Sequence, residues 1–496
     1  MQESAKGSNY YRQMSELTKY NPSQREAVTF GEGPLLVLAG PGSGKTFTIT
    51  QRILYLIHEK QIPPQKLLVI TFTREAAVSM RQRFLQISPQ HTTVNFGTFH
   101  SCFYQILLRS GRVSPGNILN EKQKKELIYP VLKKIKAHNT LSATDLPELA
   151  KNLLAAIGYY KNTGDLQSSM DRLSEEWKND FAQVYSGYEE ARKRIRGLDF
   201  DDMLKECEEL LQKDDALRIY WQNLFSYILI DEFQDINYRQ YCIVRLLAQK
   251  HKNVFAVGDD DQAIYGFRGA KPACMKQFVQ EFGAKQIILS TNYRSHQDIV
   301  EASLAVIEEN SDRFPKKLEP CEANRRHSDK MYKKNYHVRI REFSGAKEQL
   351  QFLMRQLKDR TEGETYGILF RTNLAMQSVA AGLTREGIPF SIKEHGKNIY
   401  DHFIVQDILA YLRIAQGTAA RADYLRVVNK PFRNISREAF GGEVSLQALE
   451  HYYADLMRQT GTGYLRSAYD AVRLLRRQME FVKNTDLKLA VWFLRK

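Results

Sequence analysis

The sequence predicts an α/β fold in which parallel strands alternate with helices and helical insertions interrupt the alternation. Short apolar runs that end in polar or Gly-rich turns indicate buried strands, and apolar residues recur at helical spacing between them. Two longer stretches carry helical signals alone. The chain has 496 residues, too many for one hydrophobic core, so we expect three or four compact units.

Five apolar runs are predicted to be buried parallel strands: residues 35–38, 67–70, 227–230, 254–257 and 287–289. After the first run, Ile49, Ile53 and Ile57 recur every four residues and would form the apolar face of a helix. In a parallel sheet of this kind, ligands bind at the carboxyl ends of the strands. The residues that follow each run are therefore the first candidates for a functional site.

The pattern changes three times along the rest of the chain. Over residues 111–196 the strand signals stop and the pattern is helical. A second strand-and-helix region follows, with strands predicted at 338–343 and 366–370 and a helix at 348–357. Beyond it the pattern is again mostly helical, as in 405–412.

Composition favours a reducing, aqueous compartment and a polyanionic partner. Lys and Arg number 72 against 57 Asp and Glu, a formal charge of +15 that suits nucleic acid, although charge alone does not establish this. No apolar run reaches the roughly 18 residues that a membrane span requires, and the N-terminus is polar. The five cysteines lack CxxC spacing, which argues against a metal knuckle and favours a cytoplasmic protein.

A phosphate-binding loop follows the first predicted strand. It consists of Ala39, Gly40, Pro41, Gly42, Ser43, Gly44, Lys45 and Thr46. The glycines let backbone N–H groups face phosphates, and the following helix adds the positive end of its dipole. Lys45 would bridge the β- and γ-phosphates of ATP, and the Thr46 hydroxyl would bind Mg²⁺. The strand–loop–helix context disfavours the alternative of a Gly-rich turn with an incidental lysine.

An acidic pair follows the predicted strand at 227–230. Asp231, at the end of this apolar run, is placed to hold Mg²⁺, and Glu232 to orient or deprotonate the attacking water. Such a pair could also cap a helix. The preceding strand and the phosphate loop earlier in the chain favour the catalytic interpretation.

Further segments, in order, resemble the motifs of UvrD/Rep-type superfamily 1 helicases. They are 21–28 (NPSQREAV), 70–77 (ITFTREAA), 96–101 (FGTFHS), 199–204 (DFDDML), 257–270 (VGDDDQAIYGFRGA) and 289–295 (LSTNYRS), with weaker likeness at 368–371 and 407–412. The resemblance implies RecA-like P-loop motor domains. Its division would be a first motor domain at 13–110 and 197–288, a helical insertion at 111–196, part of a second motor domain at 289–395 and a partial helical insertion at 396–496.

The same resemblance assigns residues around the nucleotide. Gln24 would read the adenine edge, since a carboxamide both donates and accepts hydrogen bonds. Tyr293 would stack on adenine, and Gln262 would sense the γ-phosphate. Arg294 would reach the γ-phosphate, where a guanidinium can stabilise charge that develops during phosphoryl transfer.

Aromatic residues are the candidate contacts to single-stranded DNA. Phe72, Tyr265 and Phe267 offer ring faces on which bases stack, each worth about 1–3 kcal/mol. Core packing is the alternative for any single aromatic, but Phe267 lies in a Gly-bracketed loop that is a poor place for a core residue. Thr98 and His100 belong to the segment at 96–101. His100 could touch a DNA phosphate or form a hydrogen bond inside the domain, and both interpretations stand.

The sequence also departs from the family pattern. Phe267 stands where Trp is commoner, which keeps a stacking face, and Phe47 stands where many members carry Arg. Two C-terminal motifs, V and VI, are not found, although motif VI would supply a second arginine to the γ-phosphate. The run at 487–496 (LKLAVWFLRK) shows no capping residue and no polar tail. We therefore expect a fragment, a truncated gene product, or a protein that lacks half of its second motor domain.

The function implied by the resemblance is ATP- and Mg²⁺-dependent translocation along single-stranded DNA. Unwinding at single-strand/duplex junctions, with 3′-to-5′ polarity, would serve DNA repair or replication. One alternative is an ATP- and DNA-binding module with little motor activity. Another is the motor subunit of a recombination helicase–nuclease, which would require clustered nuclease carboxylates or iron–sulfur cysteines.

Overall fold

A computed structural model describes residues 20–135, 146–325, 338–359, 361, 363–392, 402–441, 444–460 and 464–495. The chain divides into two compact units, Met1–Arg339 and Ile340–Lys496. Among the described residues, no helix combines the length and apolarity needed to cross a bilayer.

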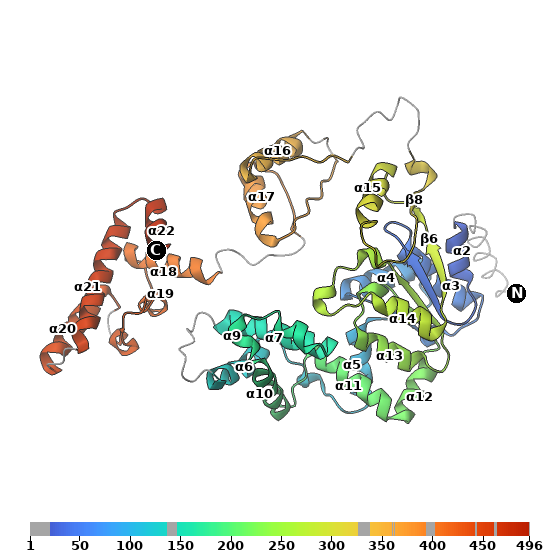
Figure 1. Ribbon diagram of the computed structural model, residues 1–496, viewed down its shortest axis with the longest axis horizontal. Helices are drawn as coiled ribbons and strands as arrows, with labels where there is room; N and C mark the ends of the chain where they lie inside the picture. Colours follow the sequence, from blue (N-terminus) through green and yellow to red (C-terminus); the bar gives the residue numbers. More distant parts are fainter. Residues whose placement is uncertain are drawn as a thin grey trace. The chain divides into compact units, whose positions relative to one another are not determined.

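A six-stranded sheet forms the centre of the first unit (Figure 1). Its order is β3 (Asn95–Thr98), β2 (Leu67–Thr71), β4 (Tyr227–Ile230), β5 (Val254–Gly258), β1 (Leu35–Ala39) and β6 (Lys285–Leu289). Every neighbouring pair is parallel. The five predicted strands are confirmed. The edge strand β3 was missed because its sequence, NFGT, is half-buried and carries no apolar run.

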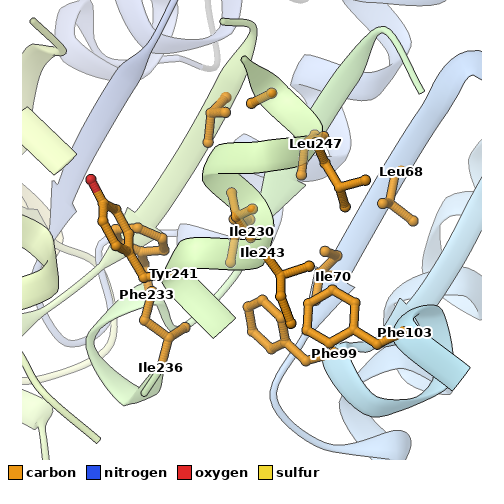
Figure 2. Packing of buried hydrophobic residues seen from close by; sticks show 14 of the residues in the cluster. Leu68, Ile70, Phe99, Phe103, Ile230, Phe233, Ile236, Tyr241, Ile243 and Leu247 are labelled. Carbon is orange, nitrogen blue, oxygen red and sulfur yellow. The ribbon is translucent and has the colours of Figure 1, made fainter. Parts of the chain in front are cut away.

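Successive residues of each inner strand point to opposite faces of the sheet, and helices cover both faces. On one face pack α5 (Phe99–Arg109), α11 (Phe200–Lys213), α12 (Asp215–Leu224), α13 (Tyr238–Ala248) and α14 (Ala273–Phe282). On the other pack α2 (Pro22–Thr29), α3 (Lys45–His58) and α4 (Arg74–Ile87). Figure 2 shows the first of these cores. Since both faces are covered, the inner strands need apolar residues at every position, which explains their uninterrupted runs.

The predicted helix face after β1 is confirmed, because Ile49, Ile53 and Ile57 of α3 are all buried in the second core. Burial of an aliphatic side chain of this size contributes about 1.5–3 kcal/mol. The face therefore fixes α3 against the sheet. It also fixes the phosphate loop, which joins β1 to the first turn of α3.

In the described part of the chain, five α-helices lie between α5 and α11 in sequence. They are α6 (Glu121–Ile135), α7 (Leu146–Thr163), α8 (Leu166–Met170), α9 (Glu175–Lys178) and α10 (Phe181–Arg194), and they enclose a core of their own. Where this segment leaves and rejoins the sheet domain, Ile118 and Leu198 form a parallel bridge. The Leu198 N–H donates to the Asn117 carbonyl over 2.8 Å.

A buried ion-pair cluster joins this helical segment to α11. Lys161 Nζ lies 2.7 Å from Glu189, 2.8 Å from Asp199 and 2.8 Å from Asp202. Arg192 pairs with Asp202 over 3.0 Å. Burial alone disfavours a charge on Lys161, but the carboxylates outweigh it and raise the pKa of the ammonium. The Lys161 ammonium therefore persists at neutral pH, and its ion pairs specify how the two parts dock.

Over the described residues of the second unit, all regular secondary structure is helical. Its helices are α16 (Ala346–Lys358), α17 (Asn373–Arg385), α18 (Phe403–Gln416), α19 (Arg421–Val427), α20 (Leu446–Thr460), α21 (Tyr464–Lys483) and α22 (Leu487–Arg495). Helices α18 to α22 share one core, and α16 and α17 pack together in a smaller one.

The predicted strands at 338–343 and 366–370 are wrong: neither segment has regular secondary structure or pairs into a sheet. Ile340 is 92% exposed and Leu369 is 96% exposed. An apolar extended segment becomes a strand only where a neighbour supplies ladder hydrogen bonds. The sequence run cannot report whether that neighbour exists.

The expectation that the run at 487–496 has no capping residue is wrong. Asp486 caps α22, because its Oδ1 accepts from the N–H groups of Lys488 (3.0 Å) and Leu489 (3.1 Å). Phe493 packs against Phe481, with ring centroids 5.0 Å apart. The aspartate immediately before the apolar run was the missed signal.

Replacing Lys161 by Met should destabilise the first unit by about 3–5 kcal/mol, because three buried carboxylates would lose their shared cation. Thermal or urea unfolding of the purified chain measures this. Lys151→Met is the control, since that lysine is exposed on the same helix. Equal stability of the two variants would contradict a structural role for the cluster.

Candidate functional site

The phosphate loop takes the backbone geometry that its glycines predict. Gly42 has φ 68° and Gly44 has φ 87°, values that residues with a Cβ rarely adopt. A Cβ on Gly42 would also lie 2.6 Å from Arg294 Cβ. Inside the loop, the Ser43 hydroxyl donates to the Gly40 carbonyl over 2.8 Å. Gly44 directly precedes α3, so the loop lies at the positive end of that helix.

Two segments distant in sequence converge on the ammonium of Lys45. Its Nζ lies 3.0 Å from Glu232 Oε2, beyond β4, and 3.3 Å from Gln262 Oε1, beyond β5. Gln234 also donates to Glu232 Oε2 over 2.9 Å. The predicted catalytic residues Lys45, Glu232 and Gln262 are therefore brought together by the sheet.

Glu232 has an unusual backbone. Its φ of 52° places it in the left-handed region, which costs a residue with a side chain roughly 1–2 kcal/mol. In this conformation its N–H donates to Asp231 Oδ1 over 3.0 Å while its carboxylate pairs with Lys45. Such strain is typical of functional positions, where the surroundings fix one orientation.

Asp231 and Thr46 line one cavity of about 430 Å³ together with Glu232 and Gln262. Burial, and then the charge of Glu232, raise the pKa of Asp231 to about 6. A divalent cation would offset both effects, and hydroxyl and carboxylate oxygens are the ligands that Mg²⁺ prefers. These residues therefore fit the predicted magnesium site.

The other predicted nucleotide residues also lie next to the phosphate loop. Gln24 Nε2 donates to the Ser43 carbonyl over 3.0 Å, and the Gln24 side chain completes a capping box with Asn21. The Tyr293 N–H donates to the Gly42 carbonyl over 2.9 Å, and Arg294 is exposed beside Gly42. Adenine reading by Gln24 and Tyr293 and γ-phosphate contact by Arg294 stay predictions.

The aromatic candidates for DNA contact form a continuous row. The rings of Phe72 and Tyr265 lie 4.7 Å apart, and those of Tyr265 and Phe267 lie 6.0 Å apart. Phe267 is 60% exposed, so core packing does not account for it. Phe72 and Phe267 both line a second cavity, of about 710 Å³, between the sheet domain and helices α6, α7 and α10.

Thr98 and His100 lie in different surroundings. Thr98 begins α5 as its capping residue and accepts from the Ser101 N–H over 3.2 Å, so its hydroxyl has a structural use. His100 lines the second cavity, and burial lowers its pKa, which favours the neutral ring. Its ring meets Phe200 edge-on, with centroids 5.6 Å apart.

Some residues of the site were missed in the sequence. Phe200 is 49% exposed in the second cavity, and its position within the motif-like segment 199–204 was the available signal. The Asn292 side-chain amide donates to the Pro41 carbonyl over 2.7 Å, and Gln234 Oε1 accepts from the Asp259 N–H over 2.9 Å. These contacts join segments far apart in the chain, which no local pattern indicates.

A phosphate loop after β1, an acidic pair after β4 and a parallel sheet define a RecA-like P-loop nucleotide-binding protein. Residues 20–283 match the UvrD/REP helicase N-terminal domain, and residues 287–461 match the UvrD-like helicase C-terminal domain. The chain belongs to the UvrD/REP helicase family.

The similar proteins include several that carry the name "ATP-dependent DNA helicase PcrA". The one from Staphylococcus aureus (strain NCTC 8325 / PS 47) is 34% identical over 443 residues, and the one from Staphylococcus epidermidis (strain ATCC 12228 / FDA PCI 1200) is 35% identical over 451 residues. Each match covers 88% of this chain. The chain spans 58% and 59% of the two relatives, respectively.

Replacing Phe267 by Ala should weaken binding of single-stranded DNA by about 1–3 kcal/mol whatever the base sequence, because stacking needs only a ring face. Fluorescence anisotropy with oligo-dT and a mixed-sequence strand at fixed salt measures this. Tyr220→Ala is the control, since Tyr220 is an exposed aromatic outside both cavities. An unchanged dissociation constant for Phe267→Ala would contradict the assignment of Phe267 as a base-stacking residue.

Proposed function

We propose that the chain is the ATP-hydrolysing part of a motor that translocates along single-stranded DNA and separates strands at single-strand/duplex junctions. The proposal is carried by the residues that the two cavities share. The first cavity contains Thr46, Asp231 and Glu232, and the second contains Phe267 and His100. The wall between them is formed by Phe72, Thr73 and Asp235, which line both cavities. A change on the nucleotide side of that wall would reach the DNA side through the same residues. The names of the relatives support the helicase assignment.

The residues have separate parts in hydrolysis. Lys45 offsets the charge of the β- and γ-phosphates, and Gln262 and Arg294 stabilise charge that develops on the transferred group. Glu232 orients the attacking water and accepts its proton. Thr46 and Asp231 would hold Mg²⁺, which supplies further charge neutralisation when bound.

We also propose 3′-to-5′ polarity and a function in DNA repair or replication. Both proposals rest on the resemblance to the family. All five cysteines have free thiols, which supports a cytoplasmic location. An ATP- and DNA-binding module with little turnover is the second candidate, because the two cavities could bind both ligands whether or not hydrolysis follows.

Replacing Glu232 by Gln should separate ATP binding from ATP hydrolysis. ATP binding should persist, because Lys45 loses a competing carboxylate 3.0 Å away, while turnover should fall by roughly 10²–10⁴. Lys45→Ala should weaken binding itself. Steady-state hydrolysis with saturating single-stranded DNA, and binding of a fluorescent ATP analogue, measure both effects.

The control is Glu59→Gln, which removes an exposed carboxylate outside both cavities. DNA-stimulated turnover in the unmodified chain supports the motor proposal. Nucleotide and DNA binding without turnover would favour the binding module. Unchanged turnover in Glu232→Gln would remove that residue from the chemistry.

A further inference from the structure

Three consecutive aspartates follow β5, and their centre is occupied by a lysine of the chain. Among the described residues, Asp259, Asp260 and Asp261 are the one acidic group close enough together to hold a metal ion. Lys316 Nζ lies 2.8 Å from Asp259 Oδ1 and 2.9 Å from Asp261 Oδ2, and it also contacts Asp260. The Lys316 side chain has no exposed surface. The cation at the centre of this group is therefore an ammonium.

The segment that carries Lys316 contacts two parts of the nucleotide site. Arg313 makes two hydrogen bonds to Asp261, of 2.9 and 2.6 Å, and the Phe314 N–H donates to Asp260 over 2.7 Å. Two residues after Lys316, Leu318 covers Gly40, where a Cβ would lie 2.4 Å from a Leu318 methyl group. The segment thus spans from the aspartates to the phosphate loop.

A chain of contacts leads from Lys316 to Lys45. Asp259 turns one carboxylate oxygen to Lys316 and accepts with the other from Gln262 Nε2, over 2.5 Å. The Gln262 carbonyl oxygen lies 3.3 Å from Lys45 Nζ. Because Lys45 can only donate and an ionised Asp259 can only accept, the two partners together determine which way the Gln262 amide faces.

We propose that Lys316 is a positioning residue for the nucleotide site, which acts through Asp259 to hold the Gln262 amide oxygen toward Lys45 and the γ-phosphate position. The proposal rests on the ATP-binding function proposed above. It extends the nucleotide site to a buried residue that touches neither the phosphate loop nor the acidic pair.

Loss of Lys316 would affect the site in a defined order. Burial alone disfavours its charge, but the three carboxylates outweigh that effect and raise its pKa, so the ammonium persists at neutral pH. Without it, Asp259 would be buried among like charges and would rotate away from them. That rotation removes the acceptor that orients Gln262, while Arg313 continues to hold Asp261.

The test measures discrimination between triphosphate and diphosphate, which does not require turnover. The affinities of the 496-residue chain for a non-hydrolysable ATP analogue with Mg²⁺ and for ADP with Mg²⁺ are compared. Lys316→Met should lower the triphosphate preference roughly tenfold, as expected for loss of one oriented hydrogen bond near a charge. Lys317→Met is the matched control, because that neighbouring side chain is 84% exposed.

A double-mutant cycle separates positioning from folding. If Lys316 acts through Gln262, Lys316→Met should add little to the loss already caused by Gln262→Ala, whereas independent structural damage should add fully. Should Lys316→Met fail to fold, Lys316→Met with Asp260→Asn removes one uncompensated charge and takes its place in the cycle. Full additivity, or a retained triphosphate preference, would overturn the proposal. Failure of the unmodified chain to bind either nucleotide would instead overturn the proposed function, and this proposal with it.

Discussion

The parallel pairing of β1 with β5 on one side and β6 on the other is the constraint on which the site depends. The register sets Leu38 against Gly258 and Ala39 against Leu289, so the three strands end together. The segments that follow them, with the segment after β4, supply Lys45, Gln262, Arg294 and Glu232. Side chains more than 200 residues apart become neighbours because parallel strands present their carboxyl ends at one edge.

This edge tolerates little change in the backbone. A Cβ on Gly258 would lie 2.8 Å from the Gln234 side chain, and one on Gly42 would meet Arg294. Glu232 holds a left-handed conformation that its neighbours enforce. Buried charges complete the constraint, because Lys316 neutralises the aspartates after β5 and Lys161 those at the start of α11. The site is thus fixed by close backbone approach and by paired buried charge.

The sequence alone predicted the features that a short run of residues determines. These features are the five strands with apolar runs, the phosphate loop and the acidic pair. Contacts between residues far apart in the chain were not predicted, because nothing in the sequence near Lys316 or Asn292 indicates which distant segment each residue contacts. For the same reason the segments at 338–343 and 366–370 were taken for strands: pairing depends on a neighbour, and the described residues provide none.

The central claim is that the nucleotide cavity and the aromatic cavity communicate through their shared wall. It is tested most directly by the affinity for a fluorescent oligo-dT strand at fixed salt, with and without a saturating non-hydrolysable ATP analogue and Mg²⁺. Coupling predicts a shift of roughly five-fold or more in the dissociation constant. The reciprocal titration, nucleotide affinity with and without DNA, should show the same factor. Identical dissociation constants with and without nucleotide would contradict the account.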